Sequence, residues 1–307
     1  MKQISKRNIG HSVFQHLLNH AKSNGEDFNL LLFRYGVERF LYRLSISQYA
    51  DRFILKGASL FLVWKGHSYR VTKDADLLGF GSEDTEDIST LFKDLCGIGS
   101  EDIDGMKFMS DTVIAVPIRE EQEYNGIRVT LLGILHQARI PMQIDIGFGD
   151  AVTPAPEKIT FPTLLDAPAP QLLAYPRYTM IAEKFEAMIR LGMANSRMKD
   201  FYDVWLLSRL FEYDGQVLCD AVRNTFNRRS TLLPDGEPLA FTDEFRKDKQ
   251  KQIQWRAFIR KSKPEATTPK DLGIIVEDIS IFLIPVFNAL QNNRPFGLIW
   301  ASGGPWG

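Results

Sequence analysis

Two short stretches decide the fold: residues 56–60, which read KGASL, and residues 70–76, which read RVTKDAD. The first is a turn of small residues that opens a helix, and the second leads into a strand that carries Asp74 and Asp76 one residue apart. Alternate side chains of a strand share a face, so both carboxylates point the same way. Neighbouring carboxylates repel each other unless a cation lies between them, and a helix N-terminus binds phosphate. The pattern therefore indicates a site for a metal ion and a nucleotide.

A third carboxylate, Asp145, stands alone in the apolar strand segment 142–148. A charge among apolar residues is costly unless it has a partner. A neighbouring strand that presents Asp145 beside Asp74 and Asp76 would complete a three-carboxylate site for Mg²⁺ or Mn²⁺. The alternative is that the D-x-D pair caps a turn or faces water. The apolar strand that follows the pair, together with the isolated Asp145, favours the metal site.

A second group of charged residues lies on two predicted helices further along the chain. Lys184 and Arg190 share the first of these helices but are six residues apart, so they diverge around it. Lys199 stands at the start of the next helix, where the helix dipole disfavours a cation unless an anion such as a triphosphate pairs with it. Asp200 and Asp203, one turn apart, could cap this helix, hold the cations, or contact a base or ribose. A salt-bridged turn between two helices explains the same residues equally well.

Composition bounds the protein class. The chain has 307 residues, a net charge of −1 and 44% hydrophobic residues, which is ordinary for a globular protein and gives no global basic field. The two cysteines are far apart and fit a reducing compartment. The N-terminus lacks a signal-peptide pattern and no apolar run approaches membrane-spanning length, so we expect a cytoplasmic location without a membrane partner.

The pattern of the chain predicts an α+β protein in two parts. Residues 1–153 mix helices with a small sheet, residues 154–176 contain six prolines and are expected to run as an extended connector, and residues 177–300 are helical. Residues 302–307 are expected to form a loose tail. The predicted strands are 53–55, 75–80, 112–118, 127–135 and 140–148, with hairpin turns at 125–126 and around residue 137.

In order, residues 55–60, 70–79, 143–147, 182–184 and 195–203 closely resemble the motifs of the AbiEii/AbiGii-type nucleotidyltransferase-like toxins of bacteria. This family is similar to the minimal polymerase-β-like nucleotidyltransferases. Its members act in toxin–antitoxin and abortive-infection (phage-defence) systems beside a winged-helix antitoxin, and some relatives transfer nucleotides to tRNA 3′ ends. One departure is that the wider superfamily favours Gly-Gly or Gly-Ser where this chain has Gly57-Ala58.

The resemblance implies roles for the residues. Asp74 and Asp76 would hold Mg²⁺ on an NTP, and Asp145 would join a second cation or act as base towards an acceptor hydroxyl. The nucleotide would lie between the two halves. Asp203 would orient Lys184 or Lys199, or touch the nucleotide, and Lys73 would serve either the nucleotide or the acceptor. The residues implied in phosphate binding are Lys56, Gly57, Ala58, Ser59, Lys184 and Lys199, and those implied in further nucleotide contacts are Arg190 and Asp200.

Other functions stay open at this level. Carboxylates with Mg²⁺ also hydrolyse phosphodiesters, so a nuclease is one alternative, and a non-catalytic nucleotide-binding partner in a complex is another. The acceptor is RNA, including tRNA, or a protein. A basic stretch from Arg223 to Lys263 is expected to be a solvated face, and it is where an RNA acceptor would bind.

Overall fold

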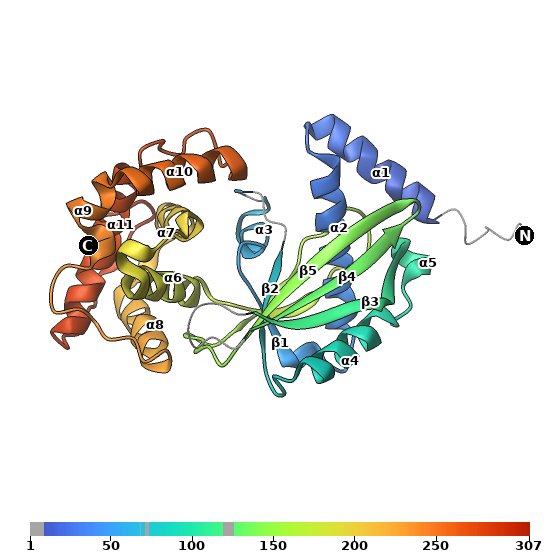
Figure 1. Cartoon of the computed structure of the whole chain (residues 1–307), viewed down its shortest axis with the longest axis horizontal. Coiled ribbons are helices and arrows are strands. Elements are labelled where there is room, and N and C mark those ends of the chain that lie inside the picture. Colours follow the sequence, from blue (N-terminus) through green and yellow to red (C-terminus); the bar gives the residue numbers. More distant parts are fainter. Residues whose placement is uncertain (1–8, 68, 71–73, 119–125) are drawn as a thin grey trace, which may run out of the picture. The chain divides into compact units, whose positions relative to one another are not determined.

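The computed structural model describes residues 9–67, 69–70, 74–118 and 126–307 (Figure 1). The chain forms two compact units, which are described one at a time. The first is Met1–Gly149 with Glu157–Ala174, and the second is Asp150–Pro156 with Tyr175–Gly307. The expected hairpin turn at 125–126 falls partly outside the described residues.

The first unit is built on a seven-stranded mixed sheet with the order β3-β4-β5-β2-β1-β7-β6. The pairs β2–β5 and β1–β7 are parallel, and the other neighbours are antiparallel. The strands are β1 (Phe53–Lys56), β2 (Ala75–Gly79), β3 (Met106–Ile118), β4 (Gly126–Leu135), β5 (Ala138–Phe148), β6 (Glu157–Thr160) and β7 (Gln171–Ala174).

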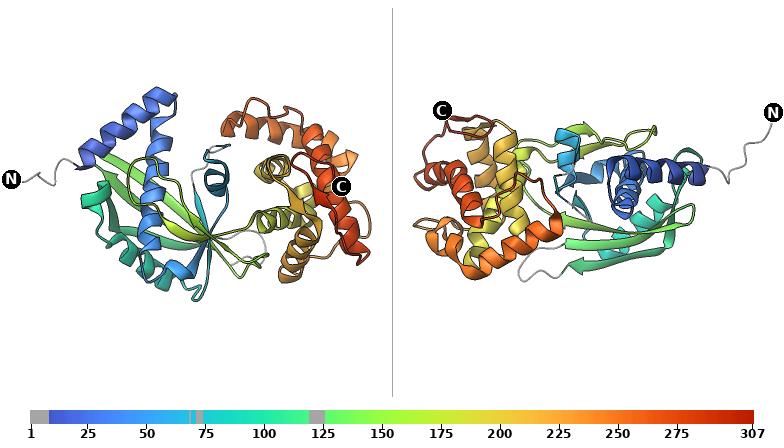
Figure 2. Two further views of the ribbon diagram at one scale, coloured as in Figure 1. Left: turned by 180° about the vertical axis from the view of Figure 1, so that it is seen from behind. Right: turned by 90° about the horizontal axis from the view of Figure 1, so that it is seen from above.

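Helices lie on one face of this sheet. The helix α2 packs on β5 and β7, and α4 packs on β3 and touches α2 (Figure 2). Burial alternates along β5, so Ile140, Met142 and Ile144 face the helices while Gln143 and Asp145 face the opposite side. The helices of the unit are α1 (Ile9–Asn24), α2 (Phe28–Ser45), α3 (Leu60–Lys65), α4 (Thr85–Cys96) and α5 (Glu101–Asp104), with a 3₁₀ turn at Ala50–Arg52.

Buried ion pairs fix α2 inside the first unit. Arg43 is fully buried and donates two hydrogen bonds to Asp104, at 2.8 and 3.2 Å. Glu38 pairs with Arg39 at 2.8 Å, and its carboxylate also accepts the Leu164 amide at 2.8 Å. Because a buried charge is costly without partners, Arg43 ties α2 to α5, and Glu38 ties it to the residues between β6 and β7.

The second unit is mainly helical. Asp214, Asp248 and Asp271 start three of its helices, and each accepts a backbone N–H of the first turn. The helices are α6 (Arg177–Leu191), α7 (Met198–Leu210), α8 (Gly215–Arg228), α9 (Asp243–Lys247), α10 (Lys249–Ser262) and α11 (Leu272–Gln291), with 3₁₀ turns at Gly192–Ala194 and Leu239–Phe241 and a short pair β8 (Tyr213–Asp214) and β9 (Ile299–Trp300).

The expectation that no apolar segment reaches membrane-spanning length was wrong. The helix α11 is long and apolar enough to cross a membrane by length and composition, but half of its apolar window is buried inside the structure. It packs on α7 and α8 and supplies core residues such as Phe282 and Phe287. A helix that packs in a protein core can have the length and apolar composition of a membrane-spanning helix, so these two properties alone do not assign α11 to a membrane.

The chain after α11 is also ordered, which corrects the expectation of a loose tail. The Trp306 indole donates to the Phe282 carbonyl at 2.9 Å and stacks on the Phe282 ring. The backbone of Gly307 exchanges two hydrogen bonds with Ile299, each 2.9 Å long. Aromatic contacts therefore fasten this segment to α11.

The α+β fold class is confirmed, and the five predicted strands coincide with all or part of β1 to β5, although β3 begins at Met106 and not at residue 112. Residues 154–176 were expected to be an extended connector, and this was wrong. Two strands in this stretch, β6 and β7, join the sheet beside β1. None of the six prolines of the stretch falls inside these two strands, so no ladder hydrogen bond is lost to them. Proline density alone therefore misled the prediction for this stretch.

We expect Glu38 to make stability depend on pH. Burial raises the pKa of Glu38 from 4.5 to about 7, against the opposing effect of Arg39. Because the folded pKa lies above the unfolded one, the stabilising contribution is complete below pH 4.5 and is lost as pH rises through about 7. Urea unfolding of the wild type should therefore show a decline of up to about 3 kcal/mol between about pH 4.5 and about pH 8 that Glu38→Gln lacks.

The matched control is Glu26→Gln, because Glu26 is partly exposed and pairs with Arg34 at the surface. It should keep the wild-type pH slope. Equal slopes for wild type and Glu38→Gln would contradict the assignment.

Candidate active site

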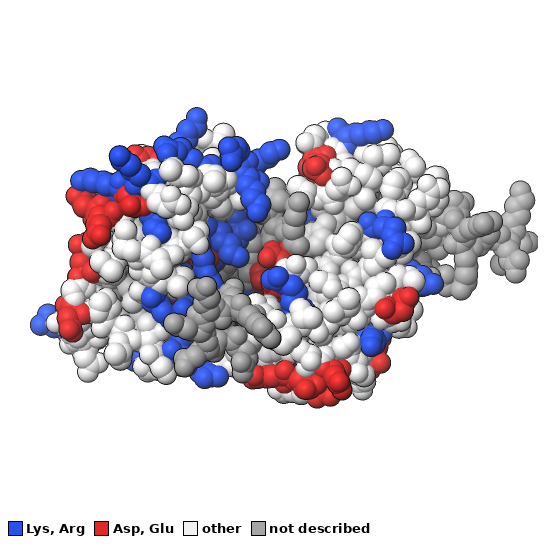
Figure 3. All heavy atoms as spheres, in the orientation of Figure 1, with Lys and Arg blue, Asp and Glu red and all other residues white. Residues whose placement is uncertain are grey.

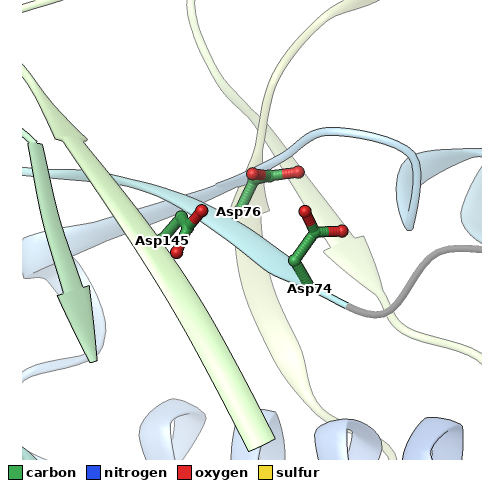
Figure 4. A group of neighbouring side chains, drawn as sticks. All are labelled: Asp74, Asp76 and Asp145. Carbon is green, nitrogen blue, oxygen red and sulfur yellow. The ribbon is translucent and has the colours of Figure 1, made fainter. Parts of the chain in front are cut away.

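Three carboxylates meet on the sheet face of the first unit that lies opposite α2 (Figure 4). Asp76 on β2 and Asp145 on β5 are register partners of a parallel pair, and Asp74 directly precedes β2. One oxygen from each carboxylate can be chosen so that all three lie within 4.8 Å of one another. All three side chains are partly exposed, so this arrangement can hold a divalent cation.

The carboxylates belong to a row of charges that runs across four adjacent strands. Three register pairs make up this row. Asp145 on β5 pairs with Arg128 on β4 on one side and with Asp76 on β2 on the other, and Asp76 pairs in turn with Lys56 on β1. Arg128 donates to both oxygens of Asp145, at 2.9 and 2.8 Å, and Gln143 adds a contact of 3.2 Å. Cations thus border the acidic centre on both sides.

The small-residue turn after β1 lies directly against this centre. Gly57 has φ +77°, and a Cβ placed there would clash with the Asp76 carboxylate. Ala58 and Ser59 are buried, and the Ser59 hydroxyl donates to the Lys56 carbonyl at 3.3 Å. The turn therefore needs glycine at residue 57 for both conformation and space.

Of the predicted residues near the carboxylates, Lys73 lies outside the described residues. Lys56 and Gly57 stand beside Asp76, and Ala58 and Ser59 follow them in the same turn. The structure therefore brings together one half of the predicted site.

The other half forms a buried ion cluster in the second unit. Lys184 on α6 donates to Asp200 at 2.7 Å and lies 3.0 Å from Asp203, both on α7. The side chains of Lys184, Asp200 and Asp203 are 14%, 7% and 0% exposed. Two carboxylates therefore fix one ammonium group in a nearly dry environment.

Two further predicted cations stand apart from this cluster. Arg190 pairs with Glu186 one turn earlier on α6, at 2.8 Å. Lys199 is exposed at the start of α7. As expected from their spacing, Lys184 and Arg190 do not act on the same partner.

Lys251 supports the loop before α7. Its ammonium group donates to the Asn195 carbonyl at 2.7 Å and lies over the Phe245 ring. Burial lowers the pKa of Lys251. The contact fixes the backbone that leads to Lys199 and Asp200, a role that the sequence did not reveal.

Two members of the basic stretch are not surface charges, which corrects the expectation of one solvated face. Lys251 is 5% exposed. The Arg229 side chain is 11% exposed and contacts Asp150 at 3.0 Å and Glu186 at 2.7 Å. Burial lowers the pKa of Arg229, but the neighbouring carboxylates of Glu183, Asp150 and Glu186 outweigh it and raise that pKa. Both side chains therefore make their polar contacts inside the second unit and not with solvent.

A mixed sheet with carboxylates on adjacent strands, a glycine turn beside them and helices on the other face is consistent with a nucleotidyltransferase. The sequence profile of the nucleotidyl transferase AbiEii toxins of type IV toxin–antitoxin systems matches residues 39–283. The chain belongs to this family. It is therefore an enzyme of a toxin–antitoxin system, with an NTP as substrate, a divalent metal ion as cofactor and a cognate antitoxin as partner.

Two solved structures from Helicobacter pylori are similar in shape. JHP933 has a TM-score of 0.45 and 11% identity, over 90% of this chain and 94% of that chain. A second protein, whose assignment as a nucleotidyltransferase is provisional, has a TM-score of 0.41 and 10% identity, over 84% and 95%. No curated protein matches the chain.

Gly57→Ala should abolish nucleotidyl transfer, because the added methyl group displaces the Asp76 carboxylate. Positive φ should also cost about 1 kcal/mol of unfolding free energy. Gly66→Ala is the matched control, because Gly66 has the same φ of +77° with open space around its Cβ position. It should lose similar stability and keep activity.

The measurements are thermal unfolding and the rate of label transfer from an NTP. Equal activity of the two variants would show that the turn has no part in organising Asp76.

Proposed function

We propose that this chain transfers a nucleoside monophosphate from an NTP to an RNA acceptor in a Mg²⁺-dependent reaction, with a tRNA 3′ end as the first candidate acceptor. The observation that carries the proposal is the convergence of Asp74, Asp76 and Asp145 beside the Gly57 turn. Carboxylate oxygens are the ligands that Mg²⁺ and Mn²⁺ prefer, so the residues present fit such an ion. When bound, the ion would neutralise charge on the phosphates.

Within this proposal, each residue of the first unit has a distinct task. Asp74 and Asp76 hold the cation. Asp145 joins them or accepts the proton of the attacking hydroxyl. Lys56, which is in register with Asp76, supplies positive charge to the phosphates, as does Lys73. The Gly57 turn lets the backbone of Ala58 and Ser59 approach a phosphate closely.

In the second unit, Lys184 and Lys199 are proposed as cations that neutralise the leaving pyrophosphate. Asp200 and Asp203 hold the Lys184 ammonium group in one position, at 2.7 and 3.0 Å. Arg190 is proposed for nucleotide binding, and in the structure it pairs with Glu186 at 2.8 Å.

The acceptor surface is proposed on α10. Figure 3 shows Lys and Arg gathered over this helix, interrupted by acidic residues near α9. The exposed cations are Lys249, Arg256, Arg260, Lys261 and, just after the helix, Lys263. Lysine and arginine bind a phosphate backbone with little sequence preference, which fits an RNA. A cytoplasmic location and a winged-helix antitoxin are part of the same proposal.

The direct experiment is to incubate the full chain with Mg²⁺, total bacterial RNA and each α-³²P-labelled NTP in turn. We expect label in RNA with wild type and with Asp111→Ala, which removes an exposed carboxylate elsewhere in the sheet. We expect none with Asp74→Ala/Asp76→Ala.

Other outcomes decide between the alternatives. Label only in protein would assign a protein acceptor, and shortened RNA without label would assign a phosphodiesterase. No label, together with no thermal shift by any Mg²⁺–NTP, would leave a non-catalytic partner in a complex.

Lys184→Met should lower the rate of transfer on the order of 10²-fold, because a fixed cation that stabilises developing charge is lost. Lys270→Met is the control, because Lys270 is an exposed lysine of the same unit. Single-turnover kinetics of both variants provide the measurement. A Lys184→Met protein that folds and transfers at the wild-type rate would assign Lys184 a purely structural role.

A further inference from the structure

The feature that the proposed function leaves unexplained is the partner of Asp145. Asp145 is the third carboxylate of the candidate metal cluster, yet Arg128 already binds both of its oxygens at 2.9 and 2.8 Å. Arg128 takes no part in the motifs of the sequence, and only the register of β4 on β5 brings it to this position.

The geometry of the pair is that of a fork. The Nε and one terminal nitrogen of Arg128 each donate to a different oxygen of Asp145, which fixes the plane of the carboxylate. The Arg128 side chain is 41% exposed and that of Asp145 is 18% exposed, so the pair lies at the accessible face of the sheet rather than in its core. The fork therefore gives the Asp145 carboxylate one orientation and places a positive charge directly against it.

The charge of Arg128 acts on the whole acidic centre. Three carboxylates with oxygens within 4.8 Å of one another repel each other and attract divalent cations strongly. A guanidinium group on Asp145 offsets one of these negative charges and occupies one lone pair on each oxygen. Gln143 adds a longer contact of 3.2 Å to the same carboxylate, and one Asp145 oxygen still lies within 4.8 Å of an oxygen of Asp74 and of Asp76.

We propose that Arg128 is a positioning residue that holds Asp145 in a fixed orientation and weakens the attraction of the carboxylate cluster for divalent cations. Asp74 and Asp76 then carry most of the cation binding, and Asp145 is kept in place for the acceptor hydroxyl. This inference rests on the proposed metal-dependent transfer.

The test measures Mn²⁺ binding to the full chain without nucleotide, by electron paramagnetic resonance, beside the rate of transfer. Arg128→Met should bind Mn²⁺ more tightly, on the order of tenfold, because the opposing charge is gone. It should also transfer at least tenfold more slowly, because Asp145 is no longer oriented.

Two variants separate charge from orientation. Arg128→Lys keeps the charge but loses the fork, so its Mn²⁺ affinity should stay near the wild type while transfer remains slow. Arg139→Met removes an exposed cation from β5 that is six residues from Asp145, and it should leave both quantities unchanged.

The outcomes distinguish this inference from the proposed function. If wild type binds Mn²⁺ no better than Asp74→Ala/Asp76→Ala, the metal centre itself is wrong, and the inference is wrong with it. If wild type binds Mn²⁺ through these carboxylates but Arg128→Met and Arg139→Met bind it equally well, only the role of Arg128 is overturned.

Discussion

The repulsion among three carboxylates on one sheet face is the constraint on which the rest of the first unit depends. Parallel pairing of β2 with β5 puts Asp76 and Asp145 side by side, and Asp74 adds a third negative charge. Arg128 and Lys56 occupy the next positions on either side. Positive charges on both sides of the acidic centre therefore offset part of this repulsion.

The two faces of this sheet have different roles: one packs in the core of the unit, and the other carries the candidate active site. The face under α2 and α4 is apolar and holds residues such as Ile140 and Met142. The opposite face carries the charged row. Strand alternation alone assigns each side chain of β5 to one of these faces, so a shift of one residue in register would exchange core and site.

Local patterns predicted more of this protein than long-range pairing did. The D-x-D pair, Asp145 and Lys184 stood out because each is a charge in an apolar or helical pattern. Arg128 did not, because its importance arises only when β4 pairs with β5. Lys251 and Arg229 read as surface cations, since burial of a long charged side chain depends on carbonyls and carboxylates far away in sequence.

The discontinuous first unit has a consequence for synthesis of the chain. The peptide leaves this unit after Gly149 and returns to it at Glu157, and only then can β7 pair with β1. Until residue 174 has been made, β1 has an open hydrogen-bonding edge, with Phe53, Ile54 and Leu55 in that strand. A nascent chain, or a truncation at about residue 150, would expose an apolar edge of the kind that recruits other strands.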